Sequence, residues 1–370
     1  MRKVLTILLT IYIINLETLI GGLQMKTKKI FIIVMTLVLA YLSTVSISAN
    51  NIQFDQYPYY VQLIIDYSNL GEVIQTHDLY DTSNVVIATC LDFENAYIIY
   101  DNNGAIVECS ESSKSKYYNI NEKAYYGGAL NYFVKKDYNY YDLSKGNIVD
   151  ADNFAKLVKK FKSHTSKRKI EIEKKANSIQ PLSGSQTPTI ESFSLRTPRA
   201  FNWNNDNTCG SLAATIILDH MNTSRKIQLS FLYENNPKIL YESLKYYCEL
   251  NYAQTGEGGS SHESLVSGFN KFTDILNLGT VAMDACFQIT YGGSDKYIFY
   301  INRLKNGVPC FVGIPGHMTV GYGGRKIYAP NGELVLSQFL INNGWGDNGI
   351  LIDTEEVDGL IVVQKPNCYK

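Results

Sequence analysis

Apolar and polar residues alternate from residue 52 to about residue 150, and clusters of turn-forming residues interrupt the alternation. This pattern is typical of antiparallel sheet. Its clearest part is residues 96–109, where Asn103 and Gly104 separate two apolar runs. An Asn-Gly pair supplies the positive φ values that a tight hairpin needs. We therefore predict a sheet-rich α+β domain at residues 50–163.

After residue 150 the periodicity changes to that of a helix. Apolar residues recur at the i, i+3, i+4, i+7 spacing of one helix face, namely at Phe154, Leu157, Val158 and Phe161. Asp150 or Asp152 is suited to cap the start of this helix. Its apolar face must pack against another element, either the preceding sheet or the domain that follows.

Residues 164–198 contain few apolar positions. They are basic at 167–169 and 174–175, and then rich in Ser, Gly, Gln and Pro as far as Pro188. Such a composition cannot bury a core. We predict an exposed linker, where proteolytic cleavage separates the N-terminal domain from a second domain at residues 199–370.

The first fifty residues contain two apolar stretches, each of which follows a Met. The second has the three parts of an export signal: lysines near its start, an apolar segment at residues 30–42, and small residues at 43–49. We predict a signal peptide at residues 25–49, cleaved after Ala49 or after Ser48. An uncleaved membrane anchor is the alternative, although the apolar run is short for a spanning helix.

Two consecutive signal-like segments have no evident purpose. We therefore interpret residues 1–24 as a spurious extension and expect translation to start at Met25. The rest of the chain would be secreted or held at the cell surface, with no stable membrane insertion once the signal is cleaved.

The chain has 370 residues, a formal net charge of -1 and 45% apolar residues, which is enough material for two domains with cores. A near-zero charge gives no basic field for binding nucleic acid. The seven cysteines are an odd number, so at least one thiol of an exported chain stays unpaired or pairs between chains. No two cysteines have CxxC spacing and only five histidines occur, which argues against a metal site.

Cys209 lies where a helix is predicted to begin. Asn207 or Thr208 is suited to cap this helix. The positions that follow form one apolar face, which consists of Leu212, Ala213, Ile216 and Ile217. Main-chain N–H groups and the helix dipole at such a position stabilise a thiolate and lower its pKa. Cys209 is therefore the candidate nucleophile; the alternative is a buried Cys that happens to begin a helix.

A nucleophilic thiol needs a base, and four of the five histidines are poor candidates. His220 is about 16 Å further along the same helix, at 1.5 Å per residue. His77 and His164 come before the second domain. His262 lies in a Gly- and Ser-rich segment, where a surface or cap role is more common.

The fifth histidine, His317, stands between two strand-like runs and directly follows Gly316. Glycine permits close approach of main chain or substrate, and a strand holds the imidazole rigidly. We predict that His317 is the general base; the alternative is a histidine that only fills the core.

A further strand-like run ends at Asn342 and leads into Asn343 and a Gly-Trp-Gly turn that contains Trp345. A neutral amide beside an imidazole holds the ring so that its other nitrogen faces the thiol. Asn342 is the candidate for this role. Asn343 could be an ordinary turn residue, and Trp345 could shield the hydrogen bond from water or simply belong to the core.

A Cys at a helix start, a Gly-His on a strand and an Asn before Gly-Trp-Gly together resemble the papain-type arrangement. Over roughly residues 201–363 the chain is similar to bacterial papain-clan cysteine peptidases of the streptopain and bacteriocin-processing groups. Their helix motif, Asn/Asp-x-Cys-Gly-x-x-Ala-Ala, matches residues 207–214, and their asparagine lies in a variant of Val-Asn-Trp-Gly-Trp-Gly. The N-terminal domain, with Tyr-Tyr-Gly-Gly-Ala-Leu at 125–130, is similar to the propeptides of that clan.

The resemblance implies an α+β papain-like fold, in which the helix with Cys209 packs on an antiparallel sheet that carries His317 and Asn342. It implies a cysteine endopeptidase that hydrolyses peptide or protein substrates and needs no metal or organic cofactor. The N-terminal domain would be a propeptide that inhibits the peptidase within the same chain.

Two positions depart from the family. The family has a Gln about six residues before its Cys as an oxyanion donor, whereas Trp203 stands there in this chain. Asn204 or Asn202 could donate instead, and the loss of such a donor typically costs ~10²-fold or more in rate. The family also often has an aromatic residue at the position of Asn343.

Two other functions are compatible with these residues. An NlpC-type cell-wall peptidase or amidase also uses Cys and His, but such enzymes favour Asp-Cys-Ser-Gly and a second His, which Thr208, Cys209 and Gly210 match poorly. The second alternative is not an enzyme. It is a surface-binding protein that kept the fold and lost the activity, with Trp203 blocking the oxyanion site.

Overall fold

The computed structural model describes residues 57–176, 188–203, 208–249, 262–278, 282–284, 293–329 and 331–364. The predicted signal peptide and the segment before it lie outside these ranges, as do Asn204 and Asn207. The chain divides into two compact units, Met1–Tyr57 and Pro58–Lys370, and all elements below belong to the second. None of the helices within the described ranges has the length and apolar character of a membrane span.

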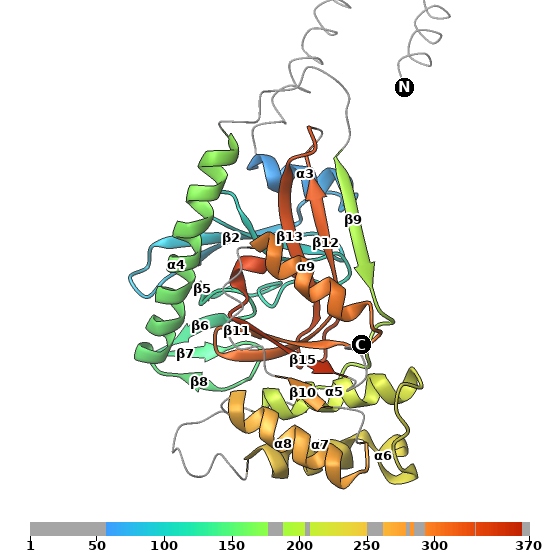
Figure 1. The fold of residues 1–370 in the computed structure, drawn as a ribbon. Coiled ribbons are helices and arrows are strands. Elements are labelled where there is room, and N and C mark those ends of the chain that lie inside the picture. The colour runs from blue at the N-terminus through green and yellow to red at the C-terminus, as the bar shows by residue number, and fades with distance from the viewer. Residues whose placement is uncertain are drawn as a thin grey trace, which may run out of the picture. The chain divides into compact units, whose positions relative to one another are not determined.

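Residues 57–176 form a sheet with two helices, which we call the N-terminal module (blue to green in Figure 1). Its elements are α3 (Tyr59–Tyr67), β1 (Gln75–Tyr80), β2 (Val86–Asp92), β3 (Tyr97–Asp101), β4 (Ile106–Ser110), β5 (Ala124–Tyr126), β6 (Tyr132–Lys136), β7 (Asn139–Asp142), β8 (Ile148–Val149) and α4 (Ala151–Ala176). β1 and β5 pair in parallel, and the other neighbouring strands pair antiparallel. The predicted sheet is therefore confirmed.

The predicted hairpin forms between β3 and β4, but its turn differs from the prediction. Of the Asn-Gly pair, Gly104 alone has a positive φ, of +79°. The turn is instead held by the Asp101 carboxylate, which accepts hydrogen bonds from the N–H groups of Asn103 and Ala105 at 2.9 and 3.1 Å. An Asp side chain can satisfy the main chain of a longer turn in this way.

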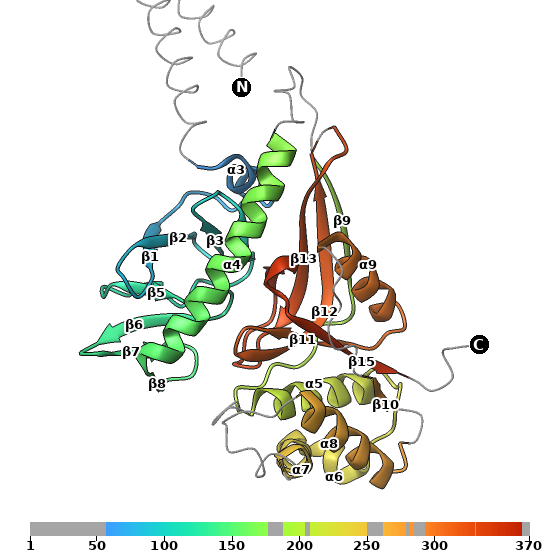
Figure 2. The same cartoon turned by 60° about the vertical axis from the view of Figure 1, so that its left-hand side comes forward.

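Helix α4 begins as predicted, because Asp150 Oδ1 accepts a hydrogen bond from Asn153 N at 2.8 Å. Its buried aromatic residues Phe154 and Phe161 pack against aromatic residues of β5, β6 and β7. Figure 2 shows the helix running along these strands. The apolar face therefore covers the preceding sheet.

The helix extends further than predicted. Residues 164–176, assigned to an exposed linker, continue α4, and Arg168 is only 3% exposed. A basic residue can be buried here because carboxylates pair with it, which composition does not reveal. At the other end of the predicted linker, Thr189–Ser194 forms strand β9 and pairs with β12.

The described residues between 188 and 364 form what we call the C-terminal module (yellow-green to red in Figure 1). After β9 its elements are α5 (Cys209–Thr223), α6 (Phe231–Asn235), α7 (Pro237–Glu249), α8 (His262–Ile275), β10 (Ala282–Asp284), α9 (Gly293–Leu304), β11 (Cys310–Ile314), β12 (His317–Tyr328), β13 (Leu334–Asn342), β14 (Ile350–Asp353), the 3-10 helix η2 (Thr354–Glu356) and β15 (Gly359–Gln364). Strands β15, β11, β12, β13 and β14 are antiparallel neighbours in that order. Helices α5, α7 and α8 lie together beside them (Figure 1), and a buried apolar cluster joins these helices to β11, β12 and β15.

The two modules share one sheet. β14 pairs antiparallel with β4, with Ile350 opposite Ser110 and Ile352 opposite Glu108. A second buried apolar cluster includes residues of both modules. The molecule is thus a mixed α+β fold with a large sheet, and the two predicted domains fall in one compact unit.

Candidate active site

Cys209 is the first residue of α5, as predicted. Residues 210–221 of this helix are all buried, because the helix packs against β12 with α7 behind it. Thr208 precedes the helix but does not cap it through its side chain; its hydroxyl lies 2.6 Å from the Tyr241 hydroxyl instead. The N–H groups of the first turn therefore stay available to the thiol.

The pKa of Cys209 differs from the prediction. Burial raises the pKa of its thiol. This effect outweighs the N–H groups of Met318, Gly210 and Cys209 itself and the positive charge of Lys145, all of which lower the pKa. The main-chain N–H groups at the helix start thus act in the predicted direction, but burial outweighs them and the pKa of Cys209 is raised in the intact chain. Because the N–H of Met318 acts on the Cys209 thiol, the thiol lies beside the first residues of β12, where His317 is located.

His317 begins β12 directly after a tight turn. Gly316 in that turn has a φ of +73°, which favours glycine. The imidazole is buried, and its Nε2 lies 2.6 Å from the main-chain carbonyl oxygen of Asn343. Because a carbonyl only accepts hydrogen bonds, Nε2 carries the proton. Nδ1, which has no hydrogen-bond partner among the described residues, is then the unprotonated nitrogen and the basic atom.

The prediction that the Asn342 side chain orients this ring is wrong in the structure. Asn342 ends β13 and is fully buried. Its Oδ1 accepts a hydrogen bond from Gly344 N at 2.9 Å, and its Nδ2 donates to Asn348 Oδ1 at 2.8 Å. Asn342 therefore shapes the loop, while the main chain of Asn343 contacts His317.

Trp345 stacks on His317, with ring centroids 3.7 Å apart and an interplanar angle of 10°. One face of the imidazole is thus shielded from water, in agreement with one of the two predicted roles. Lys145 of the N-terminal module lies over the indole ring of Trp345, with its Nζ 5.8 Å from the ring centroid. Burial first, and then the positive charge of Lys145, lower the pKa of His317 to about 3.

The oxyanion donor stays a prediction. Trp203 is stacked on Phe201 with centroids 4.4 Å apart, and its carbonyl accepts a hydrogen bond from Tyr241. Asn202 is exposed and lies near Gly346, 3.5 Å from where a Cβ of that glycine would be. Asn204 falls outside the described residues.

The other histidines lie away from this pair. His220 is buried near the end of α5 and His262 begins α8. His77 belongs to β1, and His164 to α4.

The N-terminal module reaches the His317 turn at several points that the sequence did not reveal. Asn131 Nδ2 donates to the Pro315 carbonyl at 3.2 Å. Leu157 of α4 comes within 3.3 Å of where a Cβ of Gly316 would be. Lys145 lies in the turn between β7 and β8, a short hairpin whose sequence carries no sign of a distant contact.

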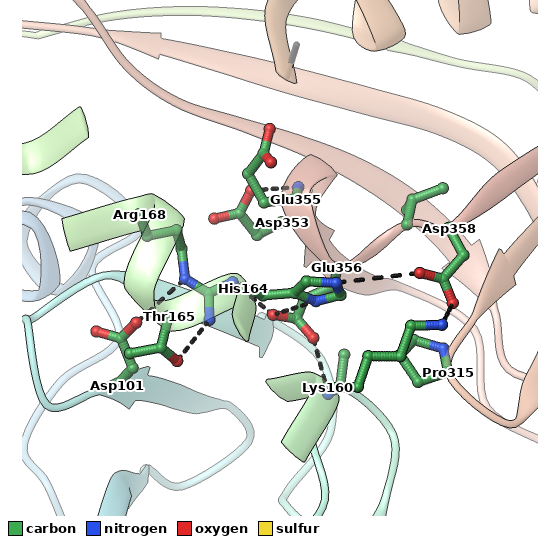
Figure 3. Close-up of polar contacts among 12 residues, drawn as sticks. Asp101, Lys160, His164, Thr165, Arg168, Pro315, Asp353, Glu355, Glu356 and Asp358 are labelled. Atoms are coloured by element: carbon green, nitrogen blue, oxygen red, sulfur yellow. Dashed lines mark hydrogen bonds and ion pairs between the residues drawn. The ribbon is translucent and has the colours of Figure 1, made fainter. Parts of the chain in front are cut away.

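A second contact between the modules is a buried ionic cluster, shown in Figure 3. Arg168 of α4 points between Asp101 of β3, at 3.1 Å, and Glu356 of η2, at 2.5 Å. His164 Nδ1 lies 3.6 Å from Glu356, and Lys160 pairs with Asp358. Arg168 lowers the pKa of Glu356 to about 2 against its burial, so this carboxylate stays charged.

Comparisons with known proteins add little to the assignment of these site residues. No family model matches the chain, and no curated protein matches it. Among solved structures, a fragment of prointerpain A from Prevotella intermedia covers 79% of this chain and 98% of its own length, at 12% identity and a TM-score of 0.39. Function is therefore inferred from the geometry of the site itself.

Proposed function

We propose that the chain is the precursor of an exported papain-like cysteine endopeptidase, with Cys209 as nucleophile and His317 as general base. One observation carries the proposal. The thiol of Cys209, at the start of the buried helix α5, lies beside the first residues of β12. The first residue of that strand is His317, whose Nε2 proton is held by a carbonyl and whose buried Nδ1 has no hydrogen-bond partner among the described residues. A histidine that only filled the core would have both ring nitrogens satisfied.

The reaction that these groups support is hydrolysis by acyl transfer. The Cys209 proton moves to His317 Nδ1 as the sulfur attacks a peptide carbonyl. The C–N bond then breaks, and His317 gives the proton to the leaving amine. Water attacks the resulting thioester and returns its proton to His317, which protonates the departing Cys209 sulfur. The N–H of Cys209 is the oxyanion donor we assign, together with an upstream Asn.

The N-terminal module keeps this pair inactive in the intact chain. The thiolate and imidazolium forms are both charged, and burial disfavours both. Lys145 opposes the positive imidazolium in addition. Removal of the module would admit water, so that the pKa of Cys209 falls and that of His317 rises. Loss of the Lys145 charge raises the pKa of His317 further and offsets part of the fall at Cys209. The module is thus a propeptide and an inhibitor within the same chain.

Incubation of the full chain, followed by mass spectrometry and a protein-digestion assay, tests the proposal. We expect the wild type to be cut between α4 and β9, to digest protein and to bind an E-64-type probe. Cys209→Ala should neither cut itself, nor digest protein, nor bind the probe. When trace wild type is added, the variant should be cut but should still not bind the probe. Cys90→Ala, which removes a buried thiol of the N-terminal module, is the matched control and should behave as wild type.

Three outcomes would contradict the proposal. Digestion of muropeptides but not of protein would favour the cell-wall peptidase. A cleaved chain without hydrolysis and without probe labelling at Cys209 would favour the binding homologue. Full activity of the uncut chain would exclude the inhibitory role of the N-terminal module.

A further inference from the structure

Asn343 and Asp347 close the loop that follows β13 through three mutual hydrogen bonds. Asn343 N donates to the Asp347 carbonyl at 3.0 Å. Asp347 N donates to Asn343 Oδ1 at 3.0 Å, and Asn343 Nδ2 donates to Asp347 Oδ2 at 2.8 Å. Asn343 Oδ1 also accepts from Trp345 N at 2.8 Å. Both the main chain and the side chain of Asn343 are therefore fixed.

This loop presents the two groups that contact His317. The carbonyl of Asn343 holds Nε2, and the ring of Trp345 stacks on the imidazole. The carboxylate of Asp347 is about one third exposed. It is linked to the ring through Asn343, whose side chain it binds and whose carbonyl contacts His317 Nε2.

We propose that Asp347 is a positioning residue for His317. Its carboxylate accepts from Asn343 Nδ2 and thereby holds the Asn343 carbonyl on Nε2, which keeps Nδ1 bare for Cys209. The proposal rests on the proposed function for its consequence in catalysis, but the tautomer that it concerns can be measured without any peptidase activity.

Asp347 also has a partner in the N-terminal module. Lys116 Nζ lies 2.8 Å from the same Oδ2 that accepts from Asn343. Two explanations of an Asp347 effect must therefore be separated: the hydrogen bond to Asn343 and the charge pair with Lys116. The chain offers substitutions that remove one without the other.

The test uses the full chain with ¹⁵N-labelled histidine and reads the tautomer of His317 by NMR, with His317→Gln to assign its signals among the five histidines. The pH dependence of Cys209 alkylation by iodoacetamide is measured in parallel by mass spectrometry of the Cys209 peptide. Asp347→Ala should mix the two tautomers and change the alkylation rate roughly tenfold, because the base is misplaced. Asp347→Asn keeps an acceptor for Asn343 Nδ2, and Lys116→Met keeps the carboxylate; both should retain the wild-type tautomer.

A polarity exchange guards against a simple folding defect. Asn343→Asp alone places two carboxylates against each other and should disturb His317 as Asp347→Ala does. The double variant N343D/D347N re-forms the bond with donor and acceptor exchanged, and should restore the single tautomer.

Three results would overturn the proposal. The first is an unchanged tautomer in Asp347→Ala, and the second is an effect of Lys116→Met as large as that of Asp347→Ala. The third is failure of the double variant to restore the tautomer. If neither the wild type nor any variant hydrolyses peptides, the proposed function fails. The tautomer measurement still decides the role of Asp347 in that case.

Discussion

Two of the ionic contacts between the N-terminal and C-terminal modules differ strongly in their burial. At η2, the side chain of Arg168 is 3% exposed and that of Glu356 is fully buried. At the loop after β13, Lys116 and Asp347 are 33% and 32% exposed. A buried pair is costly to break because one charge is left unpaired in a poorly solvated place, whereas an exposed pair is replaced by water. The Arg168–Glu356 contact therefore stabilises the association of the modules. The Lys116–Asp347 contact, which lies beside the candidate site, can be broken at little energetic cost.

The largest effect should come from Arg168→Met, which leaves Glu356 and Asp101 buried without their cation. We expect the free energy of unfolding to fall by about 3–5 kcal/mol, measured by urea denaturation at neutral pH. The double variant R168M/E356Q removes one of the two stranded charges, that of Glu356, and should recover part of the loss. A loss below about 1 kcal/mol in Arg168→Met, the range of exposed pairs, would erase the difference between the two contacts.

The next effect is a pH dependence that belongs to the buried contact. The pKa of Glu356 is lowered from 4.5 to about 2 in the folded chain. A lowered pKa means that this stabilisation is fully present above pH 4.5 and is lost as the pH falls toward 2. Its full size is about 3 kcal/mol. Urea midpoints measured between neutral pH and pH 3 should fall less steeply in Glu356→Gln than in wild type; equal slopes would contradict the assignment.

The smallest effect should come from Lys116→Met, at the exposed contact. We expect less than about 1 kcal/mol of lost stability. High salt screens exposed charges, so the difference from wild type should vanish in concentrated NaCl, whereas that of Arg168→Met should persist. A loss at Lys116 that matches the one at Arg168, or that ignores salt, would show that exposure does not distinguish the contacts.

The sequence predicted the sheet of the N-terminal module, helix α4 and the helix start at Cys209, because each follows from local periodicity and capping residues. It also placed His317 and Asn342 correctly at a strand start and a strand end. It misjudged the end of α4, since the ion pairs that bury Arg168 come from residues 101 and 356, far away in the chain.

The atom that orients His317 could not be predicted at all. Every residue carries the same main-chain carbonyl, so no residue type marks the one at Asn343. The pattern pointed instead to the Asn342 amide, which the fold uses to hold Gly344 and Asn348.

The sequence by itself thus determined which residues are the candidate nucleophile and base, because a Cys at a helix start and a Gly-His on a strand are local features. Only the tertiary structure decided the state of that pair. Burial raises the pKa of Cys209 although the charge of Lys145 lowers it, and burial together with Lys145 lowers the pKa of His317. Both effects act through space and depend on residues far apart in the chain.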